Sequence, residues 1–351
     1  MRQNKLPLFI ALIFIEVLSL ITIWSTVPDL FMSQLAFAVA GAIIIYLLSK
    51  SDIFLLLSLG KTFYVFSIVL LLITMVVGRN IRGSVRWIDL GFFNLQTSEI
   101  IKPLLAISYS AYLANMKKMN WKQFLIFFGF ALIPVALVVI QPDLGSALAL
   151  IFLPLALLTV SGHFKKLVIM GVIFTILILP LESKILKPYQ RQRLDTFINP
   201  YADPKGAGYN VIQATIAVGS GKIFGKGVKL GTQSHLNFLP ERHTDFIFAS
   251  YVEEFGFVGA TVLILSYFVI FRFGLYGIKH LHDDRQVLLS LSVFLLFLFQ
   301  FVVNVGMNLG IMPVTGITLP LFSYGGSSLL SFAILIGLLA RQLDIVTPFE
   351  I

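Results

Sequence analysis

Residues 238–256 read Phe-Leu-Pro-Glu-Arg-His-Thr-Asp-Phe-Ile-Phe-Ala-Ser-Tyr-Val-Glu-Glu-Phe-Gly. The polar residues Glu241 to Asp245 lead directly into an apolar run that continues to Phe271. A carboxylate at Asp245 is therefore expected where water meets the end of a long hydrophobic helix. An Asp side chain there can also cap the helix by accepting from its first free N–H groups. This stretch alone leaves a capping role and a chemical role for Asp245 equally open.

The rest of the chain has the composition of an integral membrane protein. Of its 351 residues, 58% are hydrophobic and 12% are charged, whereas a soluble domain averages about 25% charged residues. Crossing a bilayer takes roughly 17–25 apolar residues, and ten stretches qualify or nearly so. They are residues 6–26, 30–48, 62–77, 100–113, 124–140, 145–160, 167–181, 246–271, 287–309 and 329–343. We predict an all-α, polytopic membrane protein with about ten transmembrane helices in one domain, residues 1–351.

Basic residues predict the orientation of these helices. If the N-terminus is cytoplasmic, every loop between spans on that face carries Lys or Arg, as cytoplasmic loops do. Residues 182–244, between the seventh and eighth spans, then form a large extracytoplasmic loop, and both termini are cytoplasmic. A loop of this length is expected to be functional or disordered. The net charge of +9 indicates topology and contact with membrane lipids, and does not indicate nucleic acid.

Several polar groups lie where apolar residues would be expected. Glu99 and Lys102 are three residues apart at the start of the fourth span, so they share one helix face. They either form a structural ion pair between helices or make a polar floor for a ligand head group. Gln141-Pro142-Asp143 joins two spans and reads either as an ordinary turn or as part of a site.

Two later segments are informative about structure. Asn304 and Asn308, four residues apart in the ninth span, are expected to bond neighbouring helices. Residues 312–328 are too apolar for a free loop and predict a re-entrant piece beside a cavity. The Gly-Ser-Gly-Lys run at residues 219–222 does not match a nucleotide-binding loop, because Ile223 stands where Ser or Thr is needed.

Together these motifs resemble the shape, elongation, division and sporulation family of bacterial cell-wall polymerases. The resemblance rests on Arg86-Trp87-Ile88 with Gly91, Ser98-Glu99 with Lys102, residues 141–145, residues 238–248 and residues 312–328. It spans essentially the whole chain, and the motifs occur in order. It implies a glycosyltransferase in the bacterial cytoplasmic membrane that polymerises lipid II at the outer face, in partnership with a class B penicillin-binding protein, a transpeptidase.

The resemblance also implies site residues. Asp245 matches the family's catalytic carboxylate and would act as general base, with undecaprenyl pyrophosphate as the leaving group. The candidate substrate-binding residues are Arg86, Trp87, Glu99, Lys102, Gln141, Asp143, Arg193, Arg242, His243, Thr244 and Ser323.

The chemistry is consistent with this residue inventory. One base is required, because the attacking sugar hydroxyl must lose a proton. The pyrophosphate leaves as a stable anion and needs positive charge more than a second carboxylate. No metal site or certain cofactor is predicted, although a divalent cation could bind the pyrophosphate. The alternative function is transport of a lipid-linked cell-wall precursor across the membrane.

Overall fold

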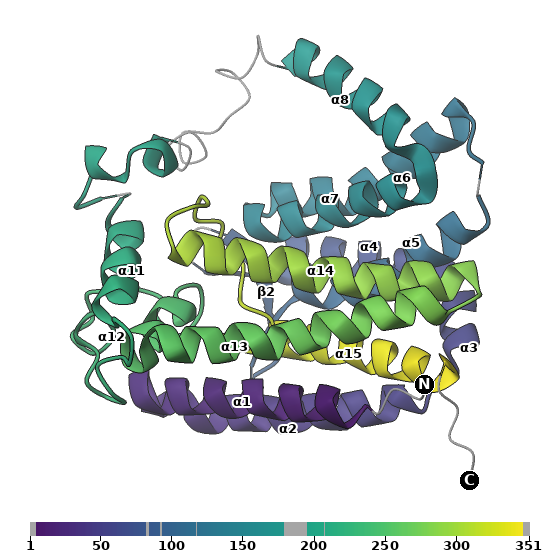
Figure 1. Ribbon diagram of the computed structural model, residues 1–351. Coiled ribbons are helices and arrows are strands. Elements are labelled where there is room, and N and C mark those ends of the chain that lie inside the picture. The colour runs from purple at the N-terminus through teal and green to yellow at the C-terminus, as the bar shows by residue number, and fades with distance from the viewer. Residues whose placement is uncertain are drawn as a thin grey trace.

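The computed structural model describes residues 5–81, 84–91, 93–116, 118–178, 195–206 and 208–346, and most of its long helices run side by side in a bundle (Figure 1). The helices are α1 (Leu6–Thr26), α2 (Phe31–Ser49), α3 (Ile53–Ser58), α4 (Gly60–Val77), α5 (Thr97–Ala114), α6 (Trp121–Ile140), α7 (Leu144–Leu158), α8 (Phe164–Ile178), α11 (Tyr209–Ser220), α12 (Thr232–His235), α13 (Ile247–His280), α14 (Asp284–Asn308) and α15 (Gly326–Val346). Short 3₁₀ turns, η1 (Pro28–Leu30) and η4 (Pro200–Ala202), and a π-helical turn, η2 (Thr159–His163), complete the helical elements.

The predicted helical membrane architecture is confirmed, although the number of crossings is not. Each predicted apolar stretch coincides with a helix where the structure describes it. In that part of the chain, eight segments are long and apolar enough to span a membrane. Two of the ten stretches account for the difference: α7 and α8 join through η2 and fall within one segment, although Gly162 (φ 82°) kinks the chain between them, and α5 is less apolar than the rest. The external position of residues 182–244 stays a prediction, and residues 182–194 lie outside the described part.

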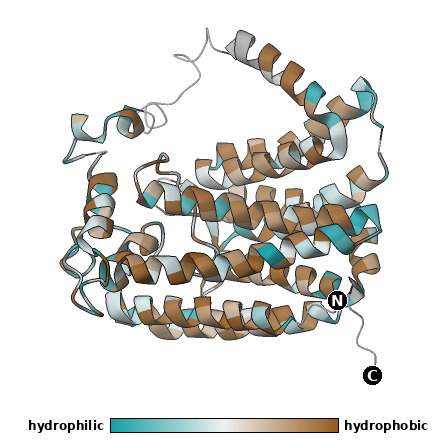
Figure 2. Ribbon diagram, in the orientation of Figure 1, coloured by the Kyte–Doolittle hydropathy of each residue, from teal (hydrophilic) through white to brown (hydrophobic). Residues whose placement is uncertain are grey.

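The outer surface of the bundle explains why these helices belong in a bilayer. Large apolar side chains point away from the protein on several helices, including Val76 at 86% and Leu47 at 61% exposure. Figure 2 shows hydrophobic residues around most of the long helices rather than along a single stripe. A helix that is apolar all round is typical of a membrane span. We infer that lipid covers this surface.

Side-chain caps fix where several helices begin. Asp52, Asp143 and Asp283 each accept from backbone N–H groups at the start of α3, α7 and α14. Asn120 and Gln123 form a reciprocal capping box at α6. These bonds satisfy N–H groups that have no partner inside the helix.

A small β-sheet was not foreseen by the sequence analysis. Strands β1 (Arg79–Ile81), β2 (Ser84–Asp89) and β3 (Asn94–Gln96) pair antiparallel in the order β1-β2-β3 between α4 and α5. Gly91 adopts a φ of 86°, and its N–H donates to Asp89 Oδ1 at 2.7 Å in the turn after β2. This turn allows Trp87 to pair with Gln96, which brings the Arg86-Trp87 motif to the start of α5.

Helix α13 is broken, where the sequence predicted an uninterrupted span. Gly256 has φ 66° and ψ −164°, which splits the helix into a short part before it and a long part after it. The loop containing the Gly-Ser-Gly-Lys run supplies the missing hydrogen bonds. Lys226 N and Gly227 N donate to the carbonyls of Glu253 and Glu254 at 2.9 and 3.0 Å, and Phe257 N and Val258 N donate to the carbonyls of Lys222 and Ile223 at 2.9 and 3.0 Å. The loop therefore replaces one turn of helix, and Lys222 at the end of the Gly-Ser-Gly-Lys run has a structural role.

The bundle closes by packing its last described helix onto α2. Helix α15 packs along α2 and also contacts α5, α13 and α14. Lys5, just before α1, pairs with Asp344 near the end of α15. Between α14 and α15, residues 309–325 form no regular helix or strand, and Ile317, Leu319 and Phe322 are buried there.

Candidate functional site

The Asp245 loop enters α13 through a tight turn. Helix α13 begins at Ile247, and its N-cap is Phe246. Asp245, the N-cap that the sequence suggested, therefore lies one residue before the observed cap. Glu241 has a φ of 52°, and its carbonyl accepts from Thr244 N and Phe246 N, each at 3.1 Å. The helix therefore begins one residue later than the sequence suggested, with an apolar residue at its N-cap.

The non-helical segment 309–325 holds this loop from one side. Ser323 Oγ donates to the carbonyl of Thr244 at 2.7 Å and accepts from Leu319 N at 2.8 Å. Tyr324 N donates to the carbonyl of His243 at 2.9 Å, and the two rings lie 5.7 Å apart between centroids. The main chain on the N-terminal side of Asp245 is therefore fixed by its neighbours.

Two asparagines of α14 hold Asp245 itself. Nδ2 of Asn304 and Nδ2 of Asn308 both donate to the main-chain carbonyl of Asp245, each at 3.0 Å. Asn304 Nδ2 also donates to the carbonyl of Ile317 at 2.8 Å, and Asn308 Oδ1 accepts from Ala249 N at 3.0 Å. Both side chains are fully buried. The prediction that these amides bond neighbouring elements is confirmed, but their convergence on Asp245 could not be read from the sequence.

A glycine leaves room beside the Asp245 carboxylate. A Cβ added to Gly316 would lie 3.5 Å from Asp245 Oδ2, and Gly316 itself has a φ of 76°. Gly145 faces the same segment, since a Cβ there would meet the carbonyl oxygen of Thr315 at 2.5 Å. Residues 315–317 thus lie between the Asp245 loop and the turn that carries Asp143.

Asp143 is the centre of a second polar cluster. Its carboxylate lies 3.3 Å from Arg86 Nη1 and accepts from Gln96 Nε2 and Ser98 Oγ, each at 3.0 Å. Ser146 N donates to it at 3.2 Å. Burial opposes ionisation, but the Arg86 charge and the hydrogen bonds from Ser146 and Ser98 outweigh it, so the pKa of Asp143 is lowered. The structure therefore brings together the predicted residues Arg86 and Asp143.

Glu99 and Lys102 form the predicted pair inside the bundle. Lys102 Nζ lies 2.5 Å from Glu99 Oε1, and the two side chains are only 1% and 8% exposed. Ser331 of α15 donates to the main-chain carbonyl of Glu99 at 2.8 Å. The pair thus lies on the face of α5 that meets α15.

The other predicted residues have different surroundings. Gln141 is buried and donates to the carbonyl of Leu71 at 3.0 Å, which ties the end of α6 to α4. Trp87 is half-buried on β2, with the Arg86 guanidinium 5.9 Å from its ring centroid. Arg242 is half-buried, with Nε donating to the carbonyl of Thr26 at 3.4 Å and Nη1 bonded to Asn237. Arg193 lies outside the described residues.

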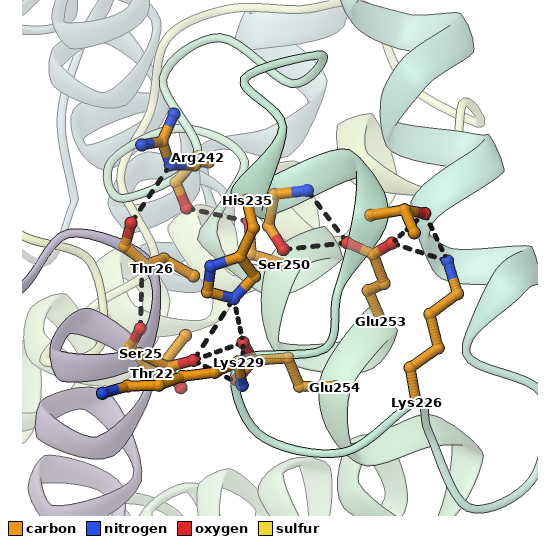
Figure 3. Close-up of polar contacts among 12 residues, drawn as sticks. Thr22, Ser25, Thr26, Lys226, Lys229, His235, Arg242, Ser250, Glu253 and Glu254 are labelled. Atoms are coloured by element: carbon orange, nitrogen blue, oxygen red, sulfur yellow. Dashed lines mark hydrogen bonds and ion pairs between the residues drawn. The ribbon is translucent and has the colours of Figure 1, made fainter.

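Two buried glutamates near the start of α13 were missed by the sequence analysis (Figure 3). Glu253 is fully buried and accepts from Lys226 Nζ at 2.8 Å, from Ser234 Oγ at 2.9 Å and from Gln233 N at 2.9 Å. Glu254 lies 2.9 Å from His235 Nε2 and also accepts from Ser25 of α1. They anchor the loop of residues 222–236 to α13 and α1. In the sequence, the only indication of a buried polar cluster here is that two adjacent glutamates interrupt an apolar run.

The described residues contain no group of three or more His, Cys, Asp or Glu side chains that could hold a metal ion.

The fold and these clusters define a helical membrane protein with a fixed carboxylate loop at one end of the bundle. The family model for FtsW, RodA and SpoVE, described as cell cycle protein, matches residues 3–344. The chain belongs to this family, and its apolar helices together with this membership make it an integral membrane protein.

Individual relatives agree with the family assignment. The chain is 36% identical over 315 residues to the probable peptidoglycan glycosyltransferase FtsW of Acinetobacter baylyi, covering 86% of this chain and 76% of the relative. It is 38% identical over 275 residues to the peptidoglycan glycosyltransferase MrdB of Escherichia coli, covering 76% and 73%.

Solved structures agree with the fold. A chain from a peptidoglycan synthase complex, studied for the coordination of polymerization and crosslinking, matches with a TM-score of 0.81 at 30% identity, covering 97% of this chain and 98% of that one. The crystal structure of the rod shape determining protein RodA of Thermus thermophilus matches with a TM-score of 0.72 at 26% identity, covering 96% of each.

Proposed function

We propose that this chain is a peptidoglycan glycosyltransferase that polymerises lipid II at the outer face of the bacterial cytoplasmic membrane, with both termini cytoplasmic. The names of the relatives support the activity. The observation that carries the site is the fixation of the Asp245 loop, whose carbonyls are held by Asn304, Asn308 and Ser323. A general base must be held in a defined direction, because proton transfer requires hydrogen-bond reach to the reacting hydroxyl.

In the proposed reaction, Asp245 accepts the proton of the acceptor sugar hydroxyl. The hydroxyl oxygen forms a bond to the anomeric carbon of the donor, while the bond from that carbon to the pyrophosphate oxygen breaks. The electron pair leaves with undecaprenyl pyrophosphate. No second carboxylate is required for the leaving group, in contrast to the paired carboxylates of ordinary glycoside hydrolysis.

Hydrogen-bond donors that directly precede Asp245 in the sequence suit the departing pyrophosphate. We assign Arg242 and His243 to pyrophosphate binding, because they directly precede Thr244 and Asp245. Arg242 is anchored by Thr26 and Asn237, so its guanidinium has a defined position. Guanidinium and phosphate groups form strong charge-assisted hydrogen bonds.

The remaining candidates act mainly by support in this proposal. Thr244 and Ser323 hydroxyls are engaged within the protein, and Gln141 is tied to α4. Asp143 holds Arg86 beside Trp87, and the Glu99–Lys102 pair supports α5. Arg193 remains a proposed contact from the long loop.

A mostly apolar cavity favours the proposal of a lipid-linked substrate. The cavity, of about 390 Å³, lies between α1, α2 and α15 and is lined by Phe9, Ile13, Val39, Ile45 and Leu321 among others. Leu321 is two residues from Ser323, which holds the Thr244 carbonyl. A lipid tail in this cavity would lie next to the segment that positions the base.

A divalent cation at the pyrophosphate is compatible with the proposal but has little protein support. Because the described residues offer no metal-holding group, most of its ligands would be pyrophosphate oxygens and water.

The decisive test is glycan synthesis from lipid II by purified Asp245→Asn. An amide cannot accept the proton, so polymerisation should fall by about 10²–10⁴-fold, while thermal stability stays near that of the wild type. Asp195→Asn, at an exposed Asp in the same long loop, is the matched control and should keep full activity. Wild-type rates in Asp245→Asn would remove it from the mechanism.

The same preparation separates the alternative function. A transporter of a lipid-linked precursor would move labelled lipid II across a vesicle bilayer without making polymer. Transport of this kind, with no glycan product under any condition, would replace the polymerase proposal.

A class B penicillin-binding protein is the proposed partner. The solved complex that resembles this chain coordinates polymerization and crosslinking, and the exposed apolar helices offer surface for a single-span protein. Co-purification with such a transpeptidase, or stimulation of glycan synthesis by it, is expected.

A further inference from the structure

A second cavity lies at the end of the bundle opposite Asp245. It has a volume of about 470 Å³ and lies between α3, α4, the end of α5 and the start of α14. Arg285 lines it, whereas Asn308 at the other end of α14 holds Asp245. At 1.5 Å per residue, these two residues of α14 are roughly 35 Å apart. The cavity is therefore separate from the proposed catalytic site.

The cavity has the charge of an anion site. Lys61, at the start of α4, and Arg285, at the start of α14, both line it, and none of its described lining residues is acidic. An anion between two cations beside one cavity is attracted to both and offsets their mutual repulsion. Both side chains are exposed rather than buried in the bundle, so neither is committed to the core.

Neutral polar groups complete the wall. Asn115 Oδ1 accepts from Arg285 Nη2 at 3.4 Å, which helps to orient the guanidinium. Ser58 and Tyr112 add hydroxyl groups to the lining. Guanidinium, ammonium and hydroxyl donors together are the groups that bind a phosphate.

Apolar residues form another part of the same wall. Leu57 and Met116 line the cavity. Gly60 allows α4 to approach α5 closely, since a Cβ there would lie 2.9 Å from the Cβ of Ala111. The cavity volume is within the range of small-molecule sites, and the mixed lining suits a ligand with a phosphate and an attached apolar part.

We propose that this cavity binds the phosphate group of an anionic phospholipid. Its position near the predicted cytoplasmic ends of the helices matches the leaflet where anionic head groups meet basic pockets between spans. The site is independent of lipid II chemistry and does not rest on the assignment of Asp245.

The test is lipid binding measured by native mass spectrometry on purified protein in detergent, titrated with phosphatidylglycerol or with phosphatidylcholine. One Lys or Arg near a membrane surface contributes about fivefold in affinity for anionic lipid. Lys61→Ala and Arg285→Ala should therefore each weaken phosphatidylglycerol binding about fivefold, and the double variant roughly 25-fold. Phosphatidylcholine should bind more weakly and change little.

Two sets of controls keep the result interpretable. Lys50→Ala removes an exposed lysine at the end of α2, whose Nζ donates to Tyr46 Oη one turn earlier in the same helix, and should leave lipid binding unchanged. Lys61→Arg and Arg285→Lys keep the charge and should keep most of the affinity. Melting temperatures close to that of the wild type establish that the variants fold.

Inorganic phosphate distinguishes the two sources of the anion. If inorganic phosphate displaces phosphatidylglycerol only at concentrations far above that of the lipid, the result supports a phospholipid as the ligand. Phosphate binding that depends on Lys61 and Arg285, without preference for phosphatidylglycerol, overturns the lipid assignment. Equal phosphatidylglycerol binding by the wild type and the double variant overturns the site.

Discussion

Asp143 and Asp245 are held in different ways. Asp143 uses its carboxylate to accept from Gln96, Ser98 and Ser146 beside the Arg86 cation. Asp245 is held through its main-chain carbonyl, which accepts hydrogen bonds from two asparagine amides. A carboxylate fully committed to structure is a poor base because its pKa is driven down. The engaged carboxylate and lowered pKa of Asp143 therefore make it a poor candidate for the base.

The lowered pKa of Asp143 predicts an acid-dependent stability. Its native pKa lies below the value in the unfolded chain, so the unfolded chain binds protons first as the pH falls. The contribution to stability is therefore full above about pH 5 and is lost as the pH falls through the native pKa. Melting temperatures measured from pH 7 to pH 3 should show a smaller acid-induced decrease in Asp143→Asn than in the wild type. Identical pH profiles would contradict the assignment.

The Glu99–Lys102 pair predicts a stability effect coupled to activity. Lys102→Ala leaves a buried carboxylate without its cation, which typically costs about 3–5 kcal/mol. We expect a lower melting temperature together with slower glycan synthesis. The double variant Glu99→Gln with Lys102→Met removes both charges and should recover much of the stability. A fully active and equally stable Lys102→Ala protein would show that the pair is dispensable.

At the scale of elements, the break in α13 leaves no room for a side chain at Gly256. A Cβ at Gly256 would lie 2.2 Å from Gly225 N and 2.5 Å from the carbonyl oxygen of Ile223. Both atoms belong to the main chain of the repairing loop, so neither can move aside cheaply. The positive φ of Gly256 adds backbone strain for any other residue.

Gly256→Ala should therefore destabilise the protein and detach the loop of residues 222–236. Limited proteolysis of purified protein, read by mass spectrometry, should show faster cleavage in this loop. Gly219→Ala is the matched control, because a Cβ there meets nothing within 4 Å and the residue lies within α11. Alanine at that position should be neutral or stabilising by about 0.5–1 kcal/mol. Equal protection of the loop in both variants would contradict the repair role.

At the scale of the whole molecule, the orientation of the bundle is testable with one residue. The chain has no native cysteine, so Asp203→Cys creates a single labelling site at an exposed position in the long loop. An impermeant thiol reagent should label it in intact cells. The matched site is Lys61→Cys at the opposite end, which should react only after the membrane is opened. The reverse pattern would invert the predicted topology.

The sequence predicted those features of the structure that depend on one segment of the chain, and it missed those that depend on contacts between distant segments. The ten apolar stretches were predictable because length and hydropathy are properties of one segment at a time. The break at Gly256 was not, because the groups that repair it lie about thirty residues earlier in the chain. The partners of Glu253 are likewise mostly loop groups that sequence spacing does not reveal.

The same distinction holds at the site. The sequence resemblance selected Asp245, Arg86 and Asp143, and the structure adds how they are held. The convergence of Asn304 and Asn308 on one carbonyl depends on the approach of α14 to the start of α13. The sheet at residues 79–96 was missed because its strands are short and interrupted by turn residues.

The packing of α15 onto α2 has a consequence for synthesis. Within this sequence α15 is translated after every other described helix, yet Ser19 of α1 bonds the Phe322 carbonyl just before it, and Lys5 pairs with Asp344 near its end. Helix α2 must therefore remain in the bilayer, with its inner face against lipid, until α15 has been made. A ribosome that stalls before Gly326 would leave a chain in which α2 lacks its main partner, and quality-control proteases of the membrane should remove it.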